Sequence, residues 1–296
     1  MKQCYARPKS ANHRKNMDLP HQTFARDKVV VMAAPNGARR TRDDHPAVPL
    51  TATELAAEAE RLLDAGVSVL HLHVRDEQGR HSIDPARYRE AITAIRERVG
   101  RQLILQVTSE AVGRYSAAEQ MAMVRELNPE AISLALRELC PDEDSEADAA
   151  AFFGGLRAAG TWPQYIVYSA AELSRFDALR KRGLFGEERP FCLLVLGRYS
   201  QKLEGSLDEL DAMRDAVDLG AFPWAVCCFG RNENAAMLAA TAEGGHARIG
   251  FENNLYLADG TPARDNSALI EQYLNSSKGM GRRPAGADDI REAWQL

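Results

Sequence analysis

Short apolar runs alternate with amphipathic stretches from residue 29 to residue 277, and this alternation constrains the fold more than any other feature. The run VVVMAAP (29–35), which is rich in β-branched residues, is typical of a strand that is buried on both faces. The stretch TATELAAEAERLLDAG (51–66) repeats apolar residues at helical spacing, begins with threonines that suit an N-cap and stops at Gly66. Repeated strand–helix units of this kind form a parallel sheet covered by helices.

Eight such units follow one another along the chain. The predicted strands cover residues 29–35, 67–74, 102–108, 131–136, 164–169, 191–197, 224–230 and 246–251, and the predicted helices cover 51–66, 84–100, 116–127, 145–159, 170–183, 206–217, 232–245 and 267–277. We therefore predict an α/β fold, a (β/α)8 TIM barrel forming a single domain over residues 28–296, because eight units in about 250 residues match that barrel. An open doubly wound sheet is the alternative, but its G-x-G-x-x-G fingerprint is absent from the first loop, PNGARR (35–40). The pattern does not place the tail over 278–296.

Composition limits the partners and the compartment. The net charge is −5, which argues against nucleic acid, and no apolar run is long enough to span a membrane. Five cysteines without CxxC spacing predict a reduced, cytoplasmic protein. The basic segment 1–27 lacks the apolar core of a signal peptide and is expected to be a poorly ordered arm; an arm that reaches over a partner subunit is the alternative.

A pair of histidines lies where the second predicted strand ends, in His71-Leu72-His73-Val74-Arg75-Asp76. In a parallel barrel the active site forms at the carboxyl ends of the strands. Side chains two residues apart on a strand share a face, so the imidazoles of His71 and His73 are expected to project together. Two such imidazoles suit a catalytic zinc site, although a hydrogen-bonded pair of core histidines would give the same pattern.

The last predicted strand supplies a carboxylate that could complete this site. Arg248 and Glu252 share a face while that strand lasts, and in a closed barrel only the first strand separates it from the second. At about 4.8 Å for each strand step, Glu252 would lie about 10 Å from the histidines, a gap that side chains can bridge. A His₂Glu set with one open position is a known catalytic zinc arrangement. A salt bridge from Glu252 to Arg248, or a capping role, is the alternative.

Several longer motifs make the chain resemble the β-keto acid cleavage enzyme family, often labelled 3-keto-5-aminohexanoate cleavage enzymes. The resemblance runs from about residue 29 to 293. Its most specific parts are AGVSVLHLHVRDEQGRHSIDPARYREAI (65–92) and GGHARIGFENNLYL (244–257), and the other matching pieces are NGARRTRDDHPAVPLTATELAAEA (36–59), LNPEAISLAL (127–136) and DNSALIEQYL (265–274).

The resemblance implies a zinc-dependent exchange between a β-keto acid and acetyl-CoA, the co-substrate. The keto acid would lose a proton between its carbonyls and attack acetyl-CoA, and a retro-Claisen step would release acetoacetate and a new acyl-CoA. It implies that His71, His73 and Glu252 bind Zn²⁺, that Arg248 is the active-site arginine, and that Thr108 and Ser133 contact the substrate. It also implies a homotetramer. We further expect Asn36, in the first loop, to contact the substrate.

Three positions depart from the family pattern. Asn253 stands where most members carry an aspartate proposed as the base, and an amide cannot take up a proton at neutral pH. Gln164 stands where members tend to have a glutamate that contacts the substrate. Arg39 stands where members that recognise an amino group carry a glutamate. Because a guanidinium attracts a carboxylate, we expect a substrate whose distal end is anionic or neutral; a solvated loop or a CoA phosphate contact is the alternative.

Other residues are expected near the same rim. Arg198 and Arg231 follow the sixth and seventh strands and could hold CoA phosphates, although each could be an ordinary surface residue. His45 and His81 lie in polar loops and are expected to be exposed to solvent. Two other functions remain open: a zinc hydrolase of the amidohydrolase kind, which usually carries HxH on its first strand and aspartate after its last, and a non-catalytic descendant that binds metal and ligand, which Asn253 keeps possible.

Overall fold

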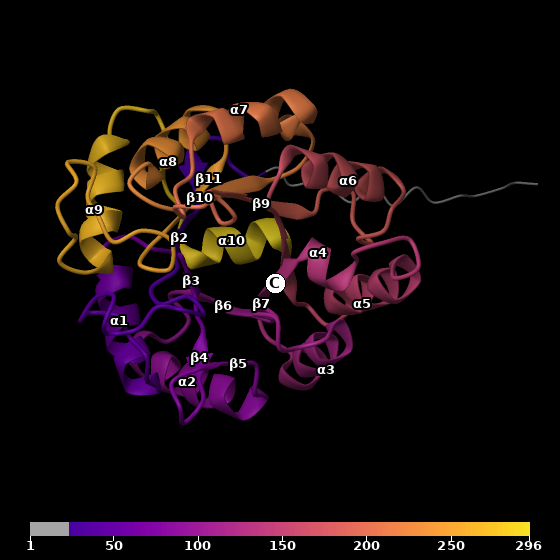
Figure 1. Ribbon diagram of the computed structural model, residues 1–296, viewed down its shortest axis with the longest axis horizontal. Helices are drawn as coiled ribbons and strands as arrows, with labels where there is room; N and C mark the ends of the chain where they lie inside the picture. The colour runs from indigo at the N-terminus through magenta and orange to yellow at the C-terminus, as the bar shows by residue number, and fades with distance from the viewer. Residues whose placement is uncertain (1–23) are drawn as a thin grey trace, which may run out of the picture.

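A closed barrel of eight parallel strands forms the centre of the protein in the computed structural model, which describes residues 24–296 (Figure 1). Around the barrel the strands are β2 (Val31–Ala33), β3 (Val69–His71), β6 (Ile104–Thr108), β7 (Ala131–Ala135), β8 (Trp162–Val167), β9 (Phe191–Leu196), β10 (Trp224–Cys228) and β11 (His246–Ile249), and β11 pairs with β2 to close the sheet. The predicted (β/α)8 barrel is therefore confirmed. Most of the predicted arm over 1–27 lies outside the described residues.

A helix follows each strand and packs on the outside of the barrel. These helices are α1 (Ala52–Asp64), α2 (Pro85–Val99), α3 (Ala117–Leu127), α5 (Glu146–Ala158), α6 (Ala170–Lys181), α7 (Leu207–Ala216), α8 (Glu233–Ala242) and α9 (Asn266–Ser276). Several begin at a capping box, in which an N-cap hydroxyl and a glutamate three residues later satisfy the first free N–H groups. Thr51 with Glu54 and Ser116 with Glu119 are examples. Within residues 24–296 no helix is both long and apolar enough to cross a membrane.

Local additions interrupt the regular pattern. The second barrel strand ends at His71, not at residue 74 as predicted, because the chain turns into a small antiparallel hairpin of β4 (Val74–Arg75) and β5 (His81–Ser82). A short helix, α4 (Leu136–Leu139), follows β7, and a 3₁₀ turn, η1 (Leu219–Ala221), precedes β10. The hairpin matters for function because it folds the chain back over the histidine pair.

The C-terminal tail closes the amino-terminal end of the barrel. β12 (Arg283–Pro284) pairs in parallel with β1 (Lys28–Val29), and α10 (Ala287–Trp294) lies across the centre of the barrel in Figure 1. Ile290 of α10 is fully buried among residues from the strand starts, and the Trp294 ring lies 4.8 Å from that of Trp162. This apolar plug gives the tail the place that its sequence pattern did not reveal.

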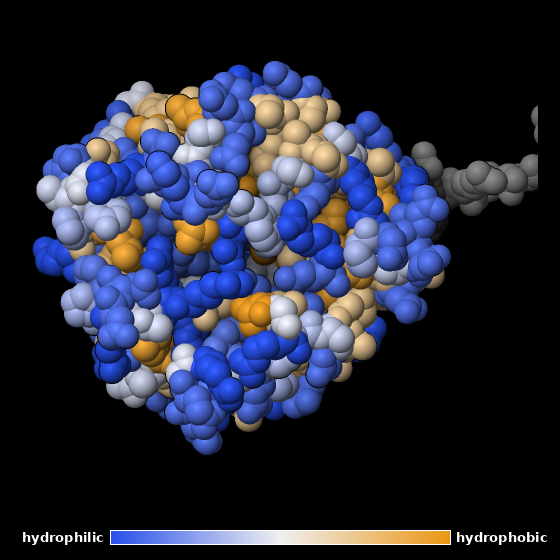
Figure 2. All heavy atoms as spheres, in the orientation of Figure 1, coloured by the Kyte–Doolittle hydropathy of each residue, from blue (hydrophilic) through white to orange (hydrophobic). Residues whose placement is uncertain are grey.

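The barrel interior changes character along its axis. Its amino-terminal half is apolar, with Met32, Ile104 and Phe191 buried beside the plug, whereas His71 and Arg248 are buried polar residues of the other half. Burying such groups is costly unless they are paired, so a polar upper layer marks the functional end of the barrel. The space-filling view shows a recess near the centre of one face, ringed mostly by hydrophilic residues (Figure 2).

Candidate metal centre and active site

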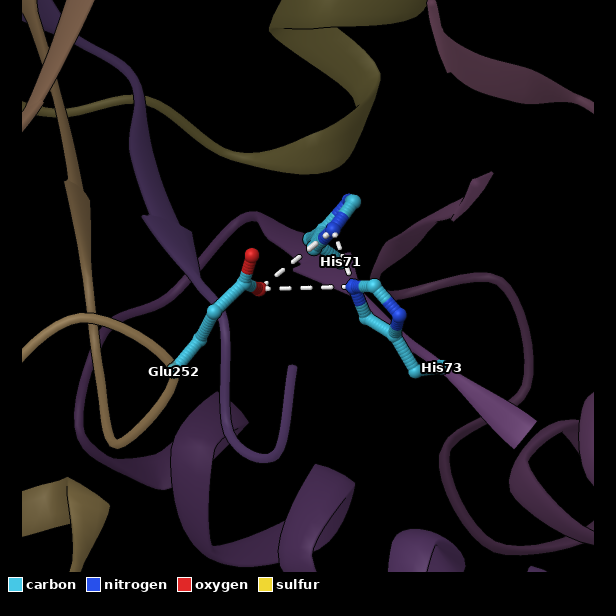
Figure 3. A group of neighbouring side chains, drawn as sticks. All are labelled: His71, His73 and Glu252. Carbon is cyan, nitrogen blue, oxygen red and sulfur yellow. Dashed lines mark hydrogen bonds and ion pairs between the residues drawn. The ribbon is translucent and has the colours of Figure 1, made fainter. Parts of the chain in front are cut away.

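Three side chains that are far apart in the sequence meet at the carboxyl ends of the barrel strands. His71 is the last residue of β3, His73 follows it by two residues, and Glu252 lies in the turn after β11 (Figure 3). The two imidazole Nε2 atoms are 3.1 Å apart, and Oε2 of Glu252 is 3.5 Å from each of them. Between residues 24 and 296, no other group of three or more His, Cys, Asp or Glu side chains converges closely enough to hold a metal ion.

The hydrogen bond of His71 leaves its inward nitrogen free of a proton. Nδ1 of His71 lies 2.9 Å from Oε1 of Gln106, an oxygen that can only accept, so Nδ1 must carry the proton. Burial, together with the charge of Arg248, holds the pKa of His71 well below its ordinary value and keeps the ring neutral. The lone pair of Nε2 therefore points toward His73. Outer partners of this kind orient metal-binding histidines in proteins.

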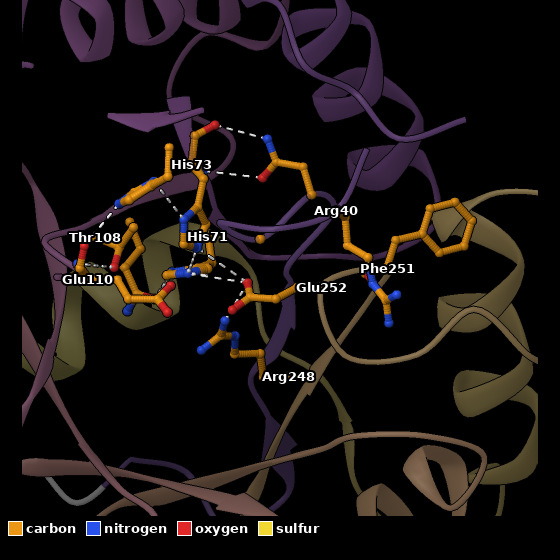
Figure 4. Close-up of polar contacts among 12 residues, drawn as sticks. Arg40, His71, His73, Thr108, Glu110, Arg248, Phe251 and Glu252 are labelled. Carbon is orange, nitrogen blue, oxygen red and sulfur yellow. Dashed lines mark hydrogen bonds and ion pairs between the residues drawn. The ribbon is translucent and has the colours of Figure 1, made fainter. Parts of the chain in front are cut away.

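A second chain of hydrogen bonds does the same for His73. Nε2 of His81 lies 3.0 Å from the carbonyl oxygen of Glu110 and must donate to it, so Nδ1 of His81 is an acceptor. Nδ1 of His73 lies 3.3 Å from that acceptor and donates to it, which leaves Nε2 of His73 unprotonated (Figure 4). Two lone pairs thus face each other across 3.1 Å, an arrangement that a cation between them would stabilise. The donor set fits a divalent metal.

The position of His81 differs from the expectation drawn from the sequence. It was expected to be exposed, but it is 3% exposed, because β5 returns the chain so that its ring packs 5.0 Å from the ring of His73. Burial, with the neighbouring His73, lowers the pKa of His81 to about 2, so this ring is neutral as well. His45, also expected to be exposed, is half-buried, and its ring lies 4.4 Å from that of Phe251.

Glu252 is held as a carboxylate by its ion pair with Arg248. Nη2 of the fully buried Arg248 lies 2.6 Å from Oε2 of Glu252, so the predicted alternative of a salt bridge exists beside the metal-binding arrangement. Burial alone would raise the pKa of Glu252, but the charge of Arg248 and the contacts with His73 and His71 together outweigh burial and hold this pKa well below its ordinary range. The carboxylate is therefore ionised, as a metal ligand must be.

The position of Glu252 depends on two close backbone approaches. β11 ends at Ile249, two residues earlier than predicted, and Glu252 reaches the histidines from a turn in which its N–H donates to the carbonyl of Ala34 at 3.0 Å. A Cβ atom at Gly37 would lie 2.5 Å from Cγ of Glu252. Gly37 also has a φ of +54°, so glycine suits this loop position both for space and for conformation.

His71, His73 and Glu252 line a pocket of about 430 Å³ at the carboxyl ends of the strands. Its polar and ionisable lining residues are His71, His73, Thr108, Glu110, Ser133, Tyr168, Arg198, Cys227, Arg248, Glu252 and Asn253. Side chains such as Ile166, Val195 and Phe229 supply apolar walls. A second cavity of about 630 Å³ lies toward Arg39 and Arg40 and shares Glu110, Arg198, Phe229 and Glu252 with the first. The site thus has an inner chamber, which holds the two histidines and Glu252, and an outer chamber lined by arginines.

The structure brings most of the predicted site residues together. Thr108, Ser133, Arg198 and Asn253 line the inner chamber with His71, His73, Glu252 and Arg248, and Arg39 lines the outer chamber. The hydroxyl of Ser133 is buried without a hydrogen-bond partner and so has bonding capacity to offer a ligand.

Three other predicted contacts lie outside both chambers. Asn36 is buried and brackets the backbone of His73, donating to its carbonyl at 2.9 Å and accepting from its N–H at 3.2 Å. Gln164 lies one layer deeper in the barrel, with Nε2 3.3 Å from the sulfur of Met32. Arg231 is exposed, and its guanidinium packs over the Tyr256 ring at 4.7 Å. Asn36 therefore positions a ligand residue, whereas Gln164 and Arg231 lack a direct path to the inner chamber.

Sequence reasoning missed two residues of the site, Glu110 and His81. Glu110 follows Thr108 by two residues at the end of β6, so the i, i+2 rule that identified the histidine pair could also have identified it. His81 gave no such local signal, since only the hairpin places it beside His73.

Comparison with known proteins identifies the family of the chain. A family model described as beta-keto acid cleavage enzyme matches residues 28–296. The chain is 32% identical to a 3-keto-5-aminohexanoate cleavage enzyme of Fusobacterium nucleatum subsp. nucleatum, over 91% of this chain and 98% of that protein. It is 24% identical to a 3-oxoadipate:acetyl-CoA acetyltransferase of Cupriavidus necator, over 88% and 93%.

Two solved structures share the fold. A ternary complex of ObcA with a C4-CoA adduct and oxalate superposes with a TM-score of 0.68 at 18% identity, covering 85% of this chain and 68% of that one. A 3-dehydroquinate dehydratase from Geobacillus kaustophilus gives 0.54 at 14% identity, covering 85% and 93%. These likenesses concern the barrel. The family match over nearly the whole described chain, together with the identity to the Fusobacterium enzyme, shows that this chain belongs to the β-keto acid cleavage enzyme family.

Proposed function

We propose that the protein is a zinc-dependent acyltransferase that converts a β-keto acid and acetyl-CoA into acetoacetate and a new acyl-CoA. The observation that carries this proposal is the convergence of two unprotonated imidazole nitrogens, 3.1 Å apart, and the ionised Glu252 inside a pocket. Relatives named for acetyl-CoA transfer and for β-keto acid cleavage support the reaction class. The amidohydrolase alternative is disfavoured, because Glu252 and then Asn253 follow the last strand where that chemistry needs aspartate.

Five residues of the chain would bind the metal or orient the side chains that bind it. His71, His73 and Glu252 would bind it, Gln106 and His81 fix the protonated nitrogens of the two rings, and these outer partners keep the inward lone pairs available. When bound, zinc supplies a Lewis acid that lowers the cost of negative charge on the oxygens of the keto acid.

Arg248 and the pocket hydroxyls suit a substrate that develops negative charge. The Arg248 guanidinium is buried beside Glu252, where a fixed charge stabilises an oxyanion more strongly than it does in water. Thr108 and Ser133 offer hydroxyl groups from the neighbouring strands β6 and β7, and they are paired in the barrel register. Asn253 adds an amide that can orient the substrate by hydrogen bonding but cannot accept its proton.

The outer chamber favours a substrate whose distal end is anionic or neutral. Arg40 is engaged by the carbonyl of Phe251 and by Asp44, whereas Arg39 lines the same chamber as an exposed guanidinium. A free guanidinium at this place would pair with a carboxylate and would repel an ammonium group. Arg198, which lines both chambers, and Arg231 on the rim are our candidates for the CoA phosphates.

Turnover of matched substrates tests this proposal. Purified protein is assayed with acetyl-CoA and either 3-oxoadipate or a 5-amino-3-oxo acid, while its metal content is measured by mass spectrometry. We expect near-stoichiometric zinc, acetoacetate release and a preference for the dicarboxylate that Arg39→Glu reverses. Absence of acetoacetate with every keto acid would favour the non-catalytic alternative, and a wild-type preference for the amino compound would contradict the role of Arg39.

We also propose a cytoplasmic homotetramer. The four cysteines within the described residues, Cys140, Cys192, Cys227 and Cys228, are free and buried, as suits a reducing compartment. Light scattering coupled to size-exclusion chromatography tests the subunit number.

A further inference from the structure

The inner chamber contains one carboxylate that the metal site does not use. Among the described residues that line it, the carboxylates are Glu252, which belongs to the ligand set, and Glu110. We infer that Glu110 is the general base that removes the proton from the carbon between the two carbonyls of the keto acid. This inference rests on the proposed function and assigns the step that Asn253 cannot perform.

The other ionisable groups of the chamber are unsuited to this step. The inward nitrogens of His71 and His73 face the metal position, and Arg248 is committed to Glu252. Burial raises the pKa of the Cys227 thiol to about 12 and lifts the pKa of the Tyr168 phenol well above its ordinary value. A base must be largely unprotonated at neutral pH, which these two groups are not.

The fold places Glu110 beside the metal ligands. It lies two residues beyond Thr108, the last residue of β6, and β6 pairs with β3, so that His71 lies opposite Gln106. Neighbouring strands are about 4.8 Å apart, so Glu110 and the histidines emerge side by side at the rim. Figure 4 shows Glu110 and Thr108 grouped next to the histidine pair.

The backbone of Glu110 is anchored while its side chain remains available. Its N–H donates to Oγ1 of Thr108 at 3.1 Å, and its carbonyl accepts from Nε2 of His81 at 3.0 Å. The side chain is 23% exposed and lines both chambers. Nη2 of Arg198 forms an ion pair with Oε1 at 3.7 Å, which is too long for a direct hydrogen bond, so the carboxylate oxygens keep lone pairs that can accept a proton.

Glu110 takes up one proton and returns it within the same catalytic cycle. An oxygen of Glu110 takes a proton from the central carbon of the keto acid, and the electron pair of that C–H bond stays on the carbon. This carbanion attacks the thioester carbonyl of acetyl-CoA, and the C–S bond breaks, so that CoA leaves as a thiolate. The thiolate adds to the original keto carbonyl of the substrate, and cleavage of the bond between that carbonyl and the central carbon gives the new acyl-CoA. When the later carbon–carbon cleavage leaves its electron pair on acetoacetate, protonated Glu110 returns the proton to that carbon. The cycle needs no further reactant.

Hydrogen–deuterium exchange separates this step from the rest of the reaction. Wild-type protein loaded with zinc is incubated with 3-oxoadipate in D₂O without acetyl-CoA, and loss of the central C–H signal is followed by NMR above the uncatalysed background. We expect Glu110→Gln to slow both this exchange and acetoacetate formation by at least about 100-fold, the usual contribution of a positioned base, with zinc content unchanged. Glu110→Asp should restore part of both rates.

Glu138→Gln is the matched control. Glu138 accepts the N–H of Ala111 beneath the same loop but lines neither chamber, so the same change of charge there should leave most of the exchange intact. Undiminished exchange in Glu110→Gln, or an equal loss in Glu138→Gln, would overturn the assignment. If the wild type exchanges no proton and turns over no keto acid, the proposed function itself fails; if it exchanges and Glu110→Gln does so equally, only the base is wrong.

Discussion

Gly37 offers a sharp test of whether the position of Glu252 governs metal binding. A Cβ atom at Gly37 would lie 2.5 Å from Cγ of Glu252, whereas ordinary contacts of a Cβ atom begin near 3.4 Å. In Gly37→Ala the glutamate must therefore shift by about 1 Å, while metal–ligand distances tolerate only about 0.2 Å. We expect zinc affinity to fall at least tenfold, which corresponds to about 1.4 kcal/mol.

Gly79 provides a control with the same backbone conformation. Its φ is +74°, close to the +54° of Gly37, but a Cβ atom there would meet nothing within 4 Å. Each alanine variant should lose about 1–2 kcal/mol of stability from the left-handed conformation alone. Only Gly37→Ala should also lose zinc affinity, because only its methyl group displaces a ligand.

Competition with a chromophoric chelator measures the zinc affinity, and urea unfolding of the metal-free proteins measures the stability. Both variants should remain folded in the second measurement, with Gly37→Ala the less stable because its methyl group displaces Glu252, and only Gly37→Ala should lose zinc affinity in the first. Equal zinc affinities in two folded variants would refute the reasoning and would mean that Glu252 is not positioned by its contact with the first loop.

Three further perturbations give separate tests. His81→Leu should weaken zinc binding about 10–100-fold in chelator competition. His81→Gln can still accept a hydrogen bond from His73 and donate one to the carbonyl of Glu110, so it should restore most of the affinity. Equal zinc affinities in the Leu variant and the wild type would contradict the tautomer argument. Burial raises the pKa of Glu233 to about 8 from an ordinary 4.5, so its contribution to stability is complete below pH 4.5 and is lost as pH rises toward 8, at about 1.4 kcal/mol per unit. In Glu233→Gln the free energy of unfolding, measured with urea, should accordingly fall less between pH 5 and pH 8 than in the wild type. An unchanged dependence on pH would argue against a raised pKa of Glu233. Removing zinc with a chelator should lower the thermal midpoint, since free metal at 100 times Kd adds about 2.7 kcal/mol to stability; no shift in calorimetry would contradict a metal-binding native state.

The periodic part of the fold was accessible from the sequence because it is encoded locally. Eight apolar runs predicted the barrel, and the threonines at the start of residues 51–66 indicated where the first helix begins, at the N-cap Thr51. The cluster of His71, His73 and Glu252 was accessible for a related reason: alternation along a strand pairs the histidines, and closure of the barrel brings the last strand close to the second. Each of these arguments needs only strand geometry and topology.

What escaped prediction depends on tertiary packing. Nothing local to His81 indicates that β5 folds it onto His73, and nothing local to Gln164 indicates that it lies a layer below the chamber, against Met32. Glu252 reaches its position from a turn rather than from the strand itself. The tail helix was unplaced because its partners, among them Trp162, lie far away in the sequence.

The first and last of the described residues lie together on the side of the barrel opposite the candidate active site. Phe24 packs against Trp294, with ring centroids 5.1 Å apart, and β1 pairs with β12 beneath the barrel. A tether attached after Leu296 would therefore hold the protein on a bead or sensor surface with its opening turned toward the solution. Acetyl-CoA, although bulky, should still reach the opening of the immobilised protein. Shortening the tether should therefore leave the association rate of acetyl-CoA unchanged.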